Sequence, residues 1–416
     1  MQSLYFGRKP VLNQDAAIEF YELLYYSQNM NKEENGFIFQ SLLCKALDKI
    51  GSQLVVGKRK VFIKVDESLF FSDKLFTISS EFFILSLSAD IDVTKESAIQ
   101  RVASLKEKGY ILAIDDFTLN GADMQKYAKI LDEVSFVKIN FDKNILVNEE
   151  NIDMLARVKE RGVSAVGKNI SDRFKYELSK RLGCGFFTGY YFSKAKMFEG
   201  DECKPPRLNI LKLYSLLAND ADFNLIIDEF KKNSSITILL LKYINSGAFH
   251  FKNRISSINH ILTLVGREPL AKWLMLVVYS MANLPNPKTS PLMLMVKNRT
   301  ELMERVLRAV EPDAGKSMLE QAYFVGVLSL IDVLFEDKMQ KILDEMNVYD
   351  VVKSALLHDK GILGEIYVLV RDIEEFKPDS IIEFERRHSL QSGTISNITI
   401  ECMKETSAFE IAVASI

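Results

Sequence analysis

The chain has 416 residues, a length that predicts two or three domains at roughly 100–200 residues each. Hydrophobic residues make up 48% of it and charged residues 26%, ordinary globular values that exclude wholesale disorder. The net charge is only −3, with 53 basic and 56 acidic residues. The net charge therefore gives no reason to expect binding to nucleic-acid polymers or to anionic membranes.

The cysteines and the N-terminal segment indicate the compartment. No pair of the 4 cysteines forms a CxxC motif, so neither a disulfide framework nor a zinc site is indicated. Free thiols fit a reducing compartment. The opening MQSLYFGRKPVL lacks the apolar core of a signal peptide, and every apolar run is far shorter than the roughly 20 residues of a membrane span. We therefore expect a cytoplasmic protein without a membrane segment.

The first half of the chain alternates short β-rich runs with helical stretches. The predicted strands are 60–65, 82–87, 110–114, 136–139 and 163–166. The predicted helices between them are 96–108, 122–133 and 152–161. Gly109 and Gly162 follow two of these helices, where glycine takes the left-handed conformation at little cost. The alternation predicts a parallel sheet with crossover helices, either a (β/α) barrel or a doubly wound sheet.

The pattern changes at Pro205-Pro206, since two prolines in a row stop a helix. Beyond them almost every segment is predicted to be helical, and we place a domain boundary between residues 203 and 204. The predicted helices are 208–217, 223–232, 235–245, 258–264, 269–282, 292–310, 316–334, 337–346 and 365–376. The segment from about Ser389 is either a short terminal helix that docks back or a frayed tail.

The sharpest local signal in the first half is Asp115-Asp116, directly after the apolar run YILAI. Chemistry in an α/β barrel collects at the carboxyl ends of the strands, and paired carboxylates there commonly bind a divalent cation. The alternative is that one aspartate caps the next helix and the other is solvated.

These residues belong to a longer series that resembles the EAL domain, the family of cyclic di-GMP phosphodiesterases. The series spans about residues 4–196 and reads FGRKPVL, YELLYYS, FIKVDESL, FILSLSADI, LAIDDFT, FVKIN, VSAVGKNI and FFTGYYFSK. The resemblance implies a TIM-like barrel that holds Mg²⁺ or Mn²⁺. It places Glu22 at the EAL glutamate, Asp115 and Asp116 at the paired aspartates, and Lys138 at the lysine of the KID motif.

Other positions depart from the family pattern. The metal-binding asparagine is aligned with Lys64, and the glutamates of two further strands are aligned with Ser86 and Val166. Asn140 stands where the family has the aspartate of the KID motif. Lys168 and Asn169 come shortly after Val166, which is aligned with the glutamate of the AEGVE motif. Tyr26 and Thr188 stand where the family has residues that contact phosphate and base, so these contacts are lost. Two further departures are Lys9, at the glutamine near the first strand, and Thr118, at the glycine of DDFG.

These departures predict that neither metal site survives, because a hard cation needs about six oxygen ligands. An ammonium group near Asp115 and Asp116 is expected to neutralise them as a salt bridge. We therefore predict no metal, no cofactor and no phosphodiesterase activity. Binding of cyclic di-GMP without turnover stays open, because Lys64 and Lys168 could contact a phosphate. A shift of two positions in the alignment would place Asp66, rather than Lys64, near the site.

The second half resembles the HDOD family, which is related to HD metal hydrolases but lacks their ligands. The resemblance rests on LKYINSGAFHF (241–251), ISSINHILTLV (255–265) and GREPLAKWLML (266–276). His358-Asp359 offers an HD pair, yet it falls late in the sequence and is expected to end a helix. His250 and His260 are expected to be a loop residue and a helix-face residue, and Trp273, Met275, Met293 and Met295 to be core residues.

The combined prediction is a TIM-like (β/α) barrel of EAL type followed by an all-α HDOD domain. The domains are 1–203, 204–390 and a C-terminal tail or docking segment at 391–416. The resemblance implies a non-catalytic bacterial signalling protein that acts as an interaction scaffold, with other signalling proteins as partners and a homodimer expected from EAL domains. The alternatives are a cyclic di-GMP receptor, a weak metal-dependent phosphodiesterase, and an HD-type phosphohydrolase centred on His358 and Asp359.

Overall fold

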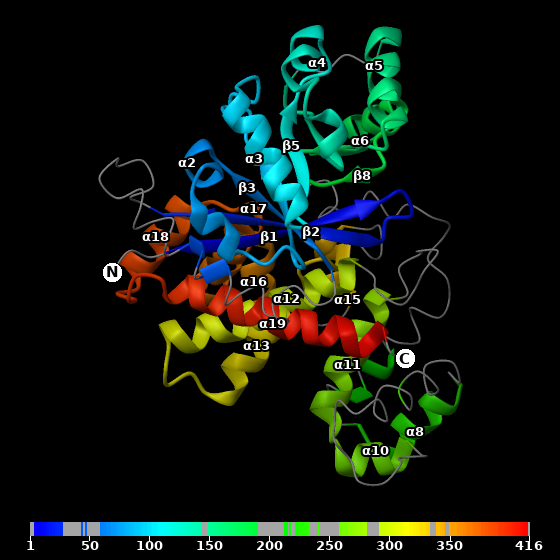
Figure 1. The fold of residues 1–416 in the computed structure, drawn as a ribbon. Helices are drawn as coiled ribbons and strands as arrows, with labels where there is room; N and C mark the ends of the chain where they lie inside the picture. Colours follow the sequence, from blue (N-terminus) through cyan, green and yellow to red (C-terminus); the bar gives the residue numbers. More distant parts are fainter. Residues whose placement is uncertain are drawn as a thin grey trace. The chain divides into compact units, whose positions relative to one another are not determined.

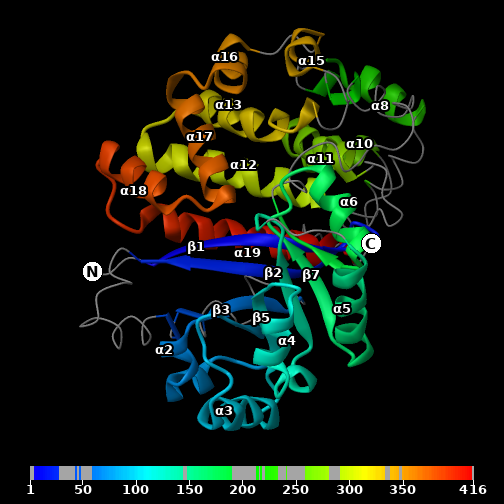
Figure 2. The same cartoon turned by 90° about the horizontal axis from the view of Figure 1, so that it is seen from above.

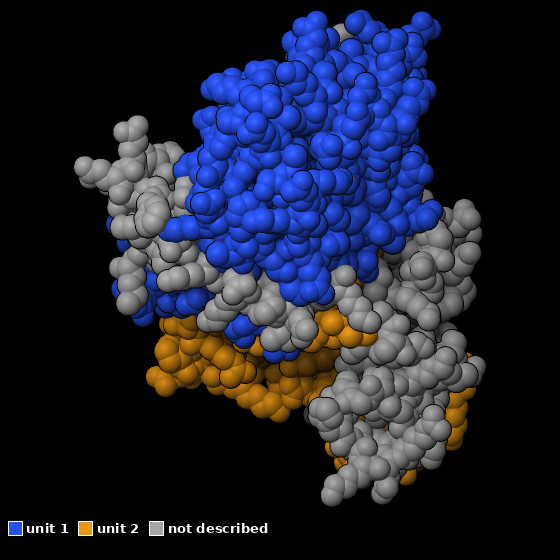
Figure 3. All heavy atoms as spheres, in the orientation of Figure 1, with its two compact units in different colours: residues 1–197, 369–405 blue, residues 198–368, 406–416 orange. Residues whose placement is uncertain are grey.

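The computed structural model describes most of the chain. The described residues are 4–27, 43–44, 46–47, 59–143, 148–189, 212–214, 216–217, 221–232, 240, 258–280, 291–332, 338–345 and 349–414. They divide into two compact units, residues 1–197 with 369–405 and residues 198–368 with 406–416 (Figure 3). The predicted boundary at 203/204 lies outside the described residues, and the predicted domain limits stay predictions.

Within the first unit, the described residues form a closed barrel with the strand order β1-β2-β3-β4-β5-β6-β7-β8 (Figures 1 and 2). This result decides between the two folds that the strand–helix alternation allowed. The strands are β1 (Tyr5–Asn13), β2 (Ile18–Tyr26), β3 (Val61–Val65), β4 (Phe83–Leu87), β5 (Ile111–Phe117), β6 (Phe136–Asn140), β7 (Ser164–Lys168) and β8 (Phe186–Phe187).

Strands β2 to β8 are parallel, whereas β1 is antiparallel to both of its neighbours, β2 and β8. Helices cross between the parallel strands on the outside of the barrel (Figure 1). They are α2 (Glu67–Phe70), η2 (Asp73–Thr77), α3 (Glu96–Glu107), α4 (Gly121–Tyr127), η3 (Leu131–Glu133), α5 (Glu149–Glu160) and α6 (Arg173–Leu182). Each crossover returns the chain to the same end of the barrel, so the carboxyl ends of β2 to β8 meet there.

Local sequence sets the ends of these helices. Asn120, Asn148 and Asp172 cap α4, α5 and α6, each accepting a hydrogen bond from a backbone amide three residues on. Gly109 and Gly162 follow α3 and α5 with φ of +81° and +79°, as the sequence predicted.

The described part of the second unit is helical, as predicted. Its helices are α8 (Phe223–Lys232), α10 (Ile258–Leu264), α11 (Arg267–Ser280), α12 (Pro291–Val310), α13 (Lys316–Leu328), α15 (Met339–Glu345) and α16 (Asp350–His358). Helices α12 and α13 pack closely because Gly326 lies against the backbone of Thr300. No described helix is long and apolar enough to cross a membrane.

Three C-terminal helices complete the chain: α17 (Gly361–Glu375), α18 (Pro378–Arg387) and α19 (Thr394–Ala414). The division between the two units falls inside α17 and again inside α19. The segment from Ser389 therefore contains a helix, as in the first of the two predicted alternatives, but at 21 residues this helix is longer than the short one expected.

Candidate functional site

The lower interior of the barrel is an apolar layer. Val11, Phe62, Ile84, Ala113 and Val166 form a buried cluster, and further aromatic side chains pack against it. The rings of Phe20, Phe62, Phe136 and Phe186 meet edge to face. This layer closes the barrel below the carboxyl ends of the strands.

The next interior layer is polar and charged. Side chains alternate between the two faces of a strand, so residues two positions beyond the apolar layer also face inward. This rule brings together residues from six parallel strands: Glu22, Lys64, Ser86, Asp115, Lys138 and Lys168. The structure thus gathers the predicted residues of β2 to β6 at one end of the barrel, but Val166 belongs to the apolar layer below.

Lys138 is the most deeply buried charge of this layer, with 2% of its side chain exposed. Its ammonium group donates a hydrogen bond to Oε1 of Glu22 and lies 3.6 Å from Oδ1 of Asp115. Burial by itself would lower the pKa of Lys138, but the two carboxylates outweigh it and raise that pKa above its ordinary value. Lys138 therefore carries its positive charge throughout the physiological pH range.

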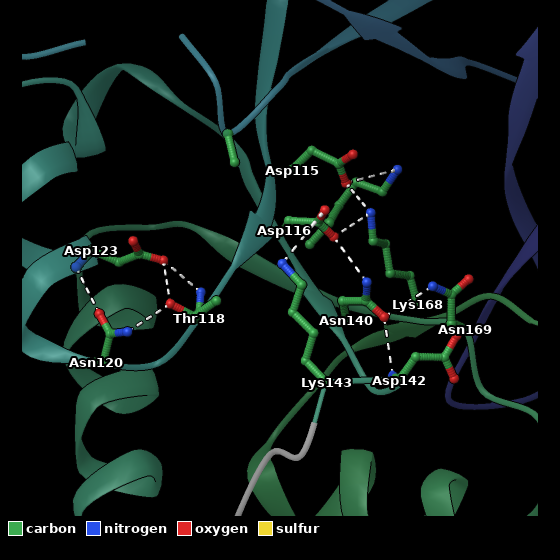
Figure 4. A network of polar contacts seen from close by, with 12 residues as sticks. Asp115, Asp116, Thr118, Asn120, Asp123, Asn140, Asp142, Lys143, Lys168 and Asn169 are labelled. Atoms are coloured by element: carbon green, nitrogen blue, oxygen red, sulfur yellow. Dashed lines mark hydrogen bonds and ion pairs between the residues drawn. The ribbon is translucent and has the colours of Figure 1, made fainter. Parts of the chain in front are cut away.

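Lys168 lies between the paired aspartates. Its Nζ is 2.7 Å from Oδ1 of Asp115 and 2.6 Å from Oδ1 of Asp116 (Figure 4). Burial opposes ionisation of both aspartates, yet the pKa of each lies below its usual value. For Asp115 the charges of Lys138 and Lys168 outweigh the burial, and for Asp116 the hydrogen bond from Lys168 does so. Both aspartates are therefore ionised and held by ammonium groups.

An amide chain extends the network from Asp116. Asn140 donates from Nδ2 to Oδ1 of Asp116 across 3.1 Å, and its own Oδ1 accepts from Nδ2 of Asn169 across 2.9 Å (Figure 4). Asp116 and Asn169 both have left-handed backbones, with φ of 55° and 59°. Aspartate and asparagine tolerate this conformation better than other non-glycine residues, so these strand ends can turn both side chains toward Asn140.

The strand register decides between Lys64 and Asp66. Lys64 pairs with Ser86 across β3 and β4, and both belong to the inward-facing set. Asp66 instead caps α2, accepting a hydrogen bond from the backbone amide of Leu69 across 2.7 Å. Ser86 is fully buried, and its hydroxyl has no hydrogen-bond partner among the described residues. The position aligned with the metal-binding asparagine thus carries an amine.

The sequence predicts an ammonium group near the aspartates but does not say which lysine supplies it. In the structure Lys64 is exposed, whereas Lys168 makes the contacts. The signal that could have identified Lys168 is its place two residues after the buried Val166, on the same strand face.

Other predicted positions lie around this layer. Lys9 of β1 pairs in register with Glu22, and the hydroxyl of Tyr25, next to Tyr26, donates to the carbonyl of Lys64 across 2.6 Å. Thr188 follows β8 and is buried, and its hydroxyl has no partner among the described residues. Thr118 donates to Asp123 on α4, so it supports a helix start.

The charge balance does not suit a divalent cation. Glu22, Asp115 and Asp116 supply three negative charges, and each carboxylate already binds an ammonium group. A hard cation needs about six oxygen ligands and would have to displace these amines. Among the described residues no cluster of three histidine, cysteine, aspartate or glutamate side chains could hold a metal ion.

The other predicted residues are in the second unit. His358 is the last residue of α16, and Asp359 follows with φ of 54° as the residue that ends the helix. This arrangement matches the predicted helix end. Met293 is buried, as expected of a core residue. His250 and the whole segment 241–257 lie outside the described residues, and the side chains of His260, Trp273 and Met275 do so as well.

Residues 208–356 match the HDOD domain family. Two curated proteins are similar over nearly the whole chain. The uncharacterized protein YuxH of Bacillus subtilis is 24% identical over 387 residues, covering 91% of this chain and 93% of YuxH. The cyclic di-GMP phosphodiesterase CdgJ of Vibrio cholerae is 23% identical over 407 residues, covering 94% of this chain and 89% of CdgJ.

Among solved structures, the cGMP-bound form of the EAL enzyme Bd1971 is 19% identical, with a TM-score of 0.39. The likeness covers 46% of this chain and 62% of the Bd1971 chain. The chain described here thus combines an eight-stranded closed barrel in its N-terminal part with a helical region in which residues 208–356 match the HDOD domain.

Proposed function

We propose that this chain is a non-catalytic signalling protein in cyclic di-GMP-linked regulation. Its barrel keeps the shape of an EAL domain without its hydrolytic chemistry, and its HDOD domain provides surfaces for other signalling proteins. The likeness to CdgJ, which is named a cyclic di-GMP phosphodiesterase, supports the link to this nucleotide. CdgJ and this chain have nearly the same extent, so the likeness involves both halves.

The observation that carries the proposal is the position of Lys168. Its ammonium group contacts both aspartates that would hold a metal ion, at 2.7 and 2.6 Å. Hydrolysis in the EAL family is implied to need divalent cations, which activate the attacking water and neutralise developing charge. An ammonium group bonded to both carboxylates neutralises them but cannot generate hydroxide from water. We infer that this barrel has lost the capacity to cleave a phosphodiester.

Exposed apolar side chains on the second unit support the interaction role. Leu225 on α8 is 57% exposed and Leu264 on α10 is 50% exposed, and these two helices contact one another. Large apolar side chains that are exposed on contacting helices are the kind of feature that marks protein interaction surfaces. They are consistent with a scaffold, whose partners would be recognised by apolar contact.

The test is incubation of the purified full-length chain with cyclic di-GMP and Mn²⁺ or Mg²⁺, followed by chromatography of the nucleotide. We expect no linear product at enzyme concentrations at which CdgJ, assayed in parallel, converts the substrate completely. Metal-dependent formation of linear product would overturn the proposal and make this chain a phosphodiesterase.

A second candidate is a receptor that binds cyclic di-GMP without turnover. The observation that favours it is the exposed ammonium of Lys64, which lies in the inward-facing register at the barrel mouth and could pair with a phosphate. Calorimetric titration of the full-length chain with cyclic di-GMP distinguishes the two. Saturable heat that is lost in Lys64→Ala, with no product in the chromatogram, would establish the receptor.

A further inference from the structure

The β1–β2 hairpin extends beyond the barrel. The register of β1 with β2 runs from Tyr5 to Leu12, whereas its pairing with β8 involves only Leu12 and Asn13. On the other side, β2 pairs with β3 through Tyr21 to Leu23. The open end of the hairpin, where Tyr5 and Phe6 pair with Tyr26 and Tyr25, therefore lies past its barrel neighbours. These two aromatic residues are nevertheless only 2% and 4% exposed.

The C-terminal part of the chain covers this open end of the hairpin. The hydroxyl of Tyr5 donates to Oε2 of Glu385 across 2.8 Å, and Oγ of Ser396 donates to the backbone carbonyl of Leu4 across 2.6 Å. The ring of Phe376 lies against Gly7, where a Cβ atom would be 2.5 Å from it. Figure 2 shows the start of α19 beside β1. We call residues 369–405 the C-terminal clasp.

The clasp is held together by its own buried polar contacts. Glu385 on α18 is 3% exposed and also accepts hydrogen bonds from the backbone amides of Gly393 and Ile395, at 3.1 and 2.8 Å. These two bonds join α18 to the start of α19. Asp372 on α17 in turn accepts from Ser380 and Lys377, which joins α17 to α18. The clasp therefore packs on β1 as one body of three linked helices.

The chain enters and leaves the clasp through the second unit. The division between the units falls after residue 368, inside α17, and after residue 405, inside α19 (Figure 3). Helices are rigid over lengths of this kind, so a movement at either boundary is passed along the helix axis. A segment that completes the barrel unit is thus covalently attached at both ends to the unit with the HDOD match.

The hairpin also leads to the candidate site. Lys9 of β1 pairs in register with Glu22 of β2, and Glu22 accepts the hydrogen bond from the buried Lys138. Farther along β2, the hydroxyl of Tyr25 donates to the carbonyl of Lys64. A displacement of β1 would therefore reach two residues of the polar layer through the strand to which β1 is hydrogen-bonded.

We propose that the C-terminal clasp is a built-in regulatory device that conveys the state of the HDOD unit to the barrel mouth. The hydrogen bond from Tyr5 to Glu385 is its latch. When the HDOD unit changes conformation, α17 and α19 shift the clasp, the latch loosens, and the β1–β2 hairpin becomes mobile. The proposal does not depend on nucleotide binding or on the absence of hydrolysis.

Hydrogen–deuterium exchange of the full-length chain tests the latch. Tyr5→Phe removes this hydrogen bond and Glu385→Gln weakens it, and both nearly keep the side-chain volume. We expect the amide exchange rates of residues 5–12 and 18–26 to rise about tenfold or more, which is the size of effect that loss of one such hydrogen bond implies. The exchange rates in α5 should not change. The matched control is Glu383→Gln, two residues away on the same helix, where the carboxylate is exposed and pairs with Arg386. Unchanged exchange in β1 and β2 of both latch variants would refute the latch.

The coupling is tested by perturbing the second unit alone. In Gly326→Ala the added methyl group would lie 2.7 Å from Cα of Thr300, so α12 and α13 must separate. We expect faster exchange in residues 5–12 of this variant, and no further increase when it is combined with Glu385→Gln. If Gly326→Ala changes the hydrogen–deuterium exchange of residues 291–332 but not that of residues 5–12, the proposed coupling is refuted. This holds whether or not the two latch variants support the latch.

Discussion

Lys168 donates a hydrogen bond from Nζ to Oδ1 of Asp115 across 2.7 Å, although the two residues are 53 positions apart in the sequence. The contact joins the ends of β5 and β7, two strands that are not neighbours in the barrel. It can form only because both side chains point into the interior. The bond therefore depends on the arrangement of the strands in the closed barrel, and it occupies a carboxylate that the resemblance assigned to a metal ion.

Removal of the Lys168 ammonium should restore part of the affinity for a divalent cation. In Lys168→Ala, Asp115 and Asp116 lose their nearest positive charge, and a cation at their oxygens no longer meets that repulsion. We expect calorimetry to detect Mn²⁺ binding at least about tenfold tighter than to the unaltered chain. Lys143→Ala, which removes an exposed lysine 3.8 Å from Asp116, is the control and should change little. Equal Mn²⁺ heats in the two variants would contradict this account.

Replacement of the buried Lys138 should be costly. Lys138→Met keeps an unbranched side chain of similar length but leaves Glu22 without its ammonium partner in a buried layer. Breaking a buried ion pair by removing one partner costs about 3–5 kcal/mol, and we expect a loss of that size in the free energy of unfolding by urea. Lys143→Met at the exposed edge should lose less than about 1 kcal/mol. A loss below about 1 kcal/mol in Lys138→Met would mean that the network is not structural.

The pKa shifts set the expected dependence of stability on pH. The folded pKa of Asp115 is lowered, so its contribution is present above the unfolded value of about 3.9 and is lost as pH falls through the folded pKa. The folded pKa of Lys138 is raised, so its contribution is present below about 10.4 and is lost only as pH rises through a still higher value. The two groups thus predict constant stability from about pH 5 to pH 9 and a decline below about pH 4.

Urea unfolding at a series of acidic pH values checks this dependence. In Asp115→Asn the group cannot titrate, so its share of the acid decline disappears and the slope against pH becomes shallower. The variant will also be less stable at neutral pH, because Lys168 and Lys138 each lose a carboxylate. An unchanged acid slope would show that other carboxylates cause the decline.

Asn140→Asp restores the residue type of the KID motif and should destabilise this barrel. The amide that donates to Asp116 becomes a carboxylate, so a hydrogen bond 3.1 Å long turns into a repulsion between like charges. We expect a loss of about 1–3 kcal/mol in the free energy of unfolding. Added Mn²⁺ should recover part of this loss, which thermal unfolding with and without the metal would reveal. A gain in stability without metal would contradict the network.

Much of the barrel was predictable from strand and helix periodicity. Strands β3 to β7 lie within two or three residues of the predicted runs, because each is a short apolar segment bounded by polar helices. Strands β1, β2 and β8 were not predicted from the periodicity. β8 has only two residues, and the pattern of β1 and β2 is interrupted by charged side chains at the barrel mouth.

The candidate site was predictable in its members but not in its pairings. Local sequence places Asp115 and Asp116 at a strand end, and the alternation of strand faces places Lys64 and Ser86 inward. Which lysine reaches the aspartates depends on barrel closure, which brings β7 toward β5 and leaves Lys64 exposed. The contact from Tyr5 to Glu385, 380 residues along the chain, has no local signal at all.

The C-terminal clasp also sets the order in which a newly made chain can fold. Its last residues are synthesised after the whole of 198–368, yet they complete the unit to which β1 belongs. At roughly 5–20 residues per second, ribosomes need roughly ten to forty seconds to pass from the end of β8 to the end of the clasp. During that interval Tyr5 and Phe6 have no partner from the C-terminal side and present apolar surface. The barrel unit of the nascent chain therefore stays incomplete until the helical region and the clasp have been synthesised.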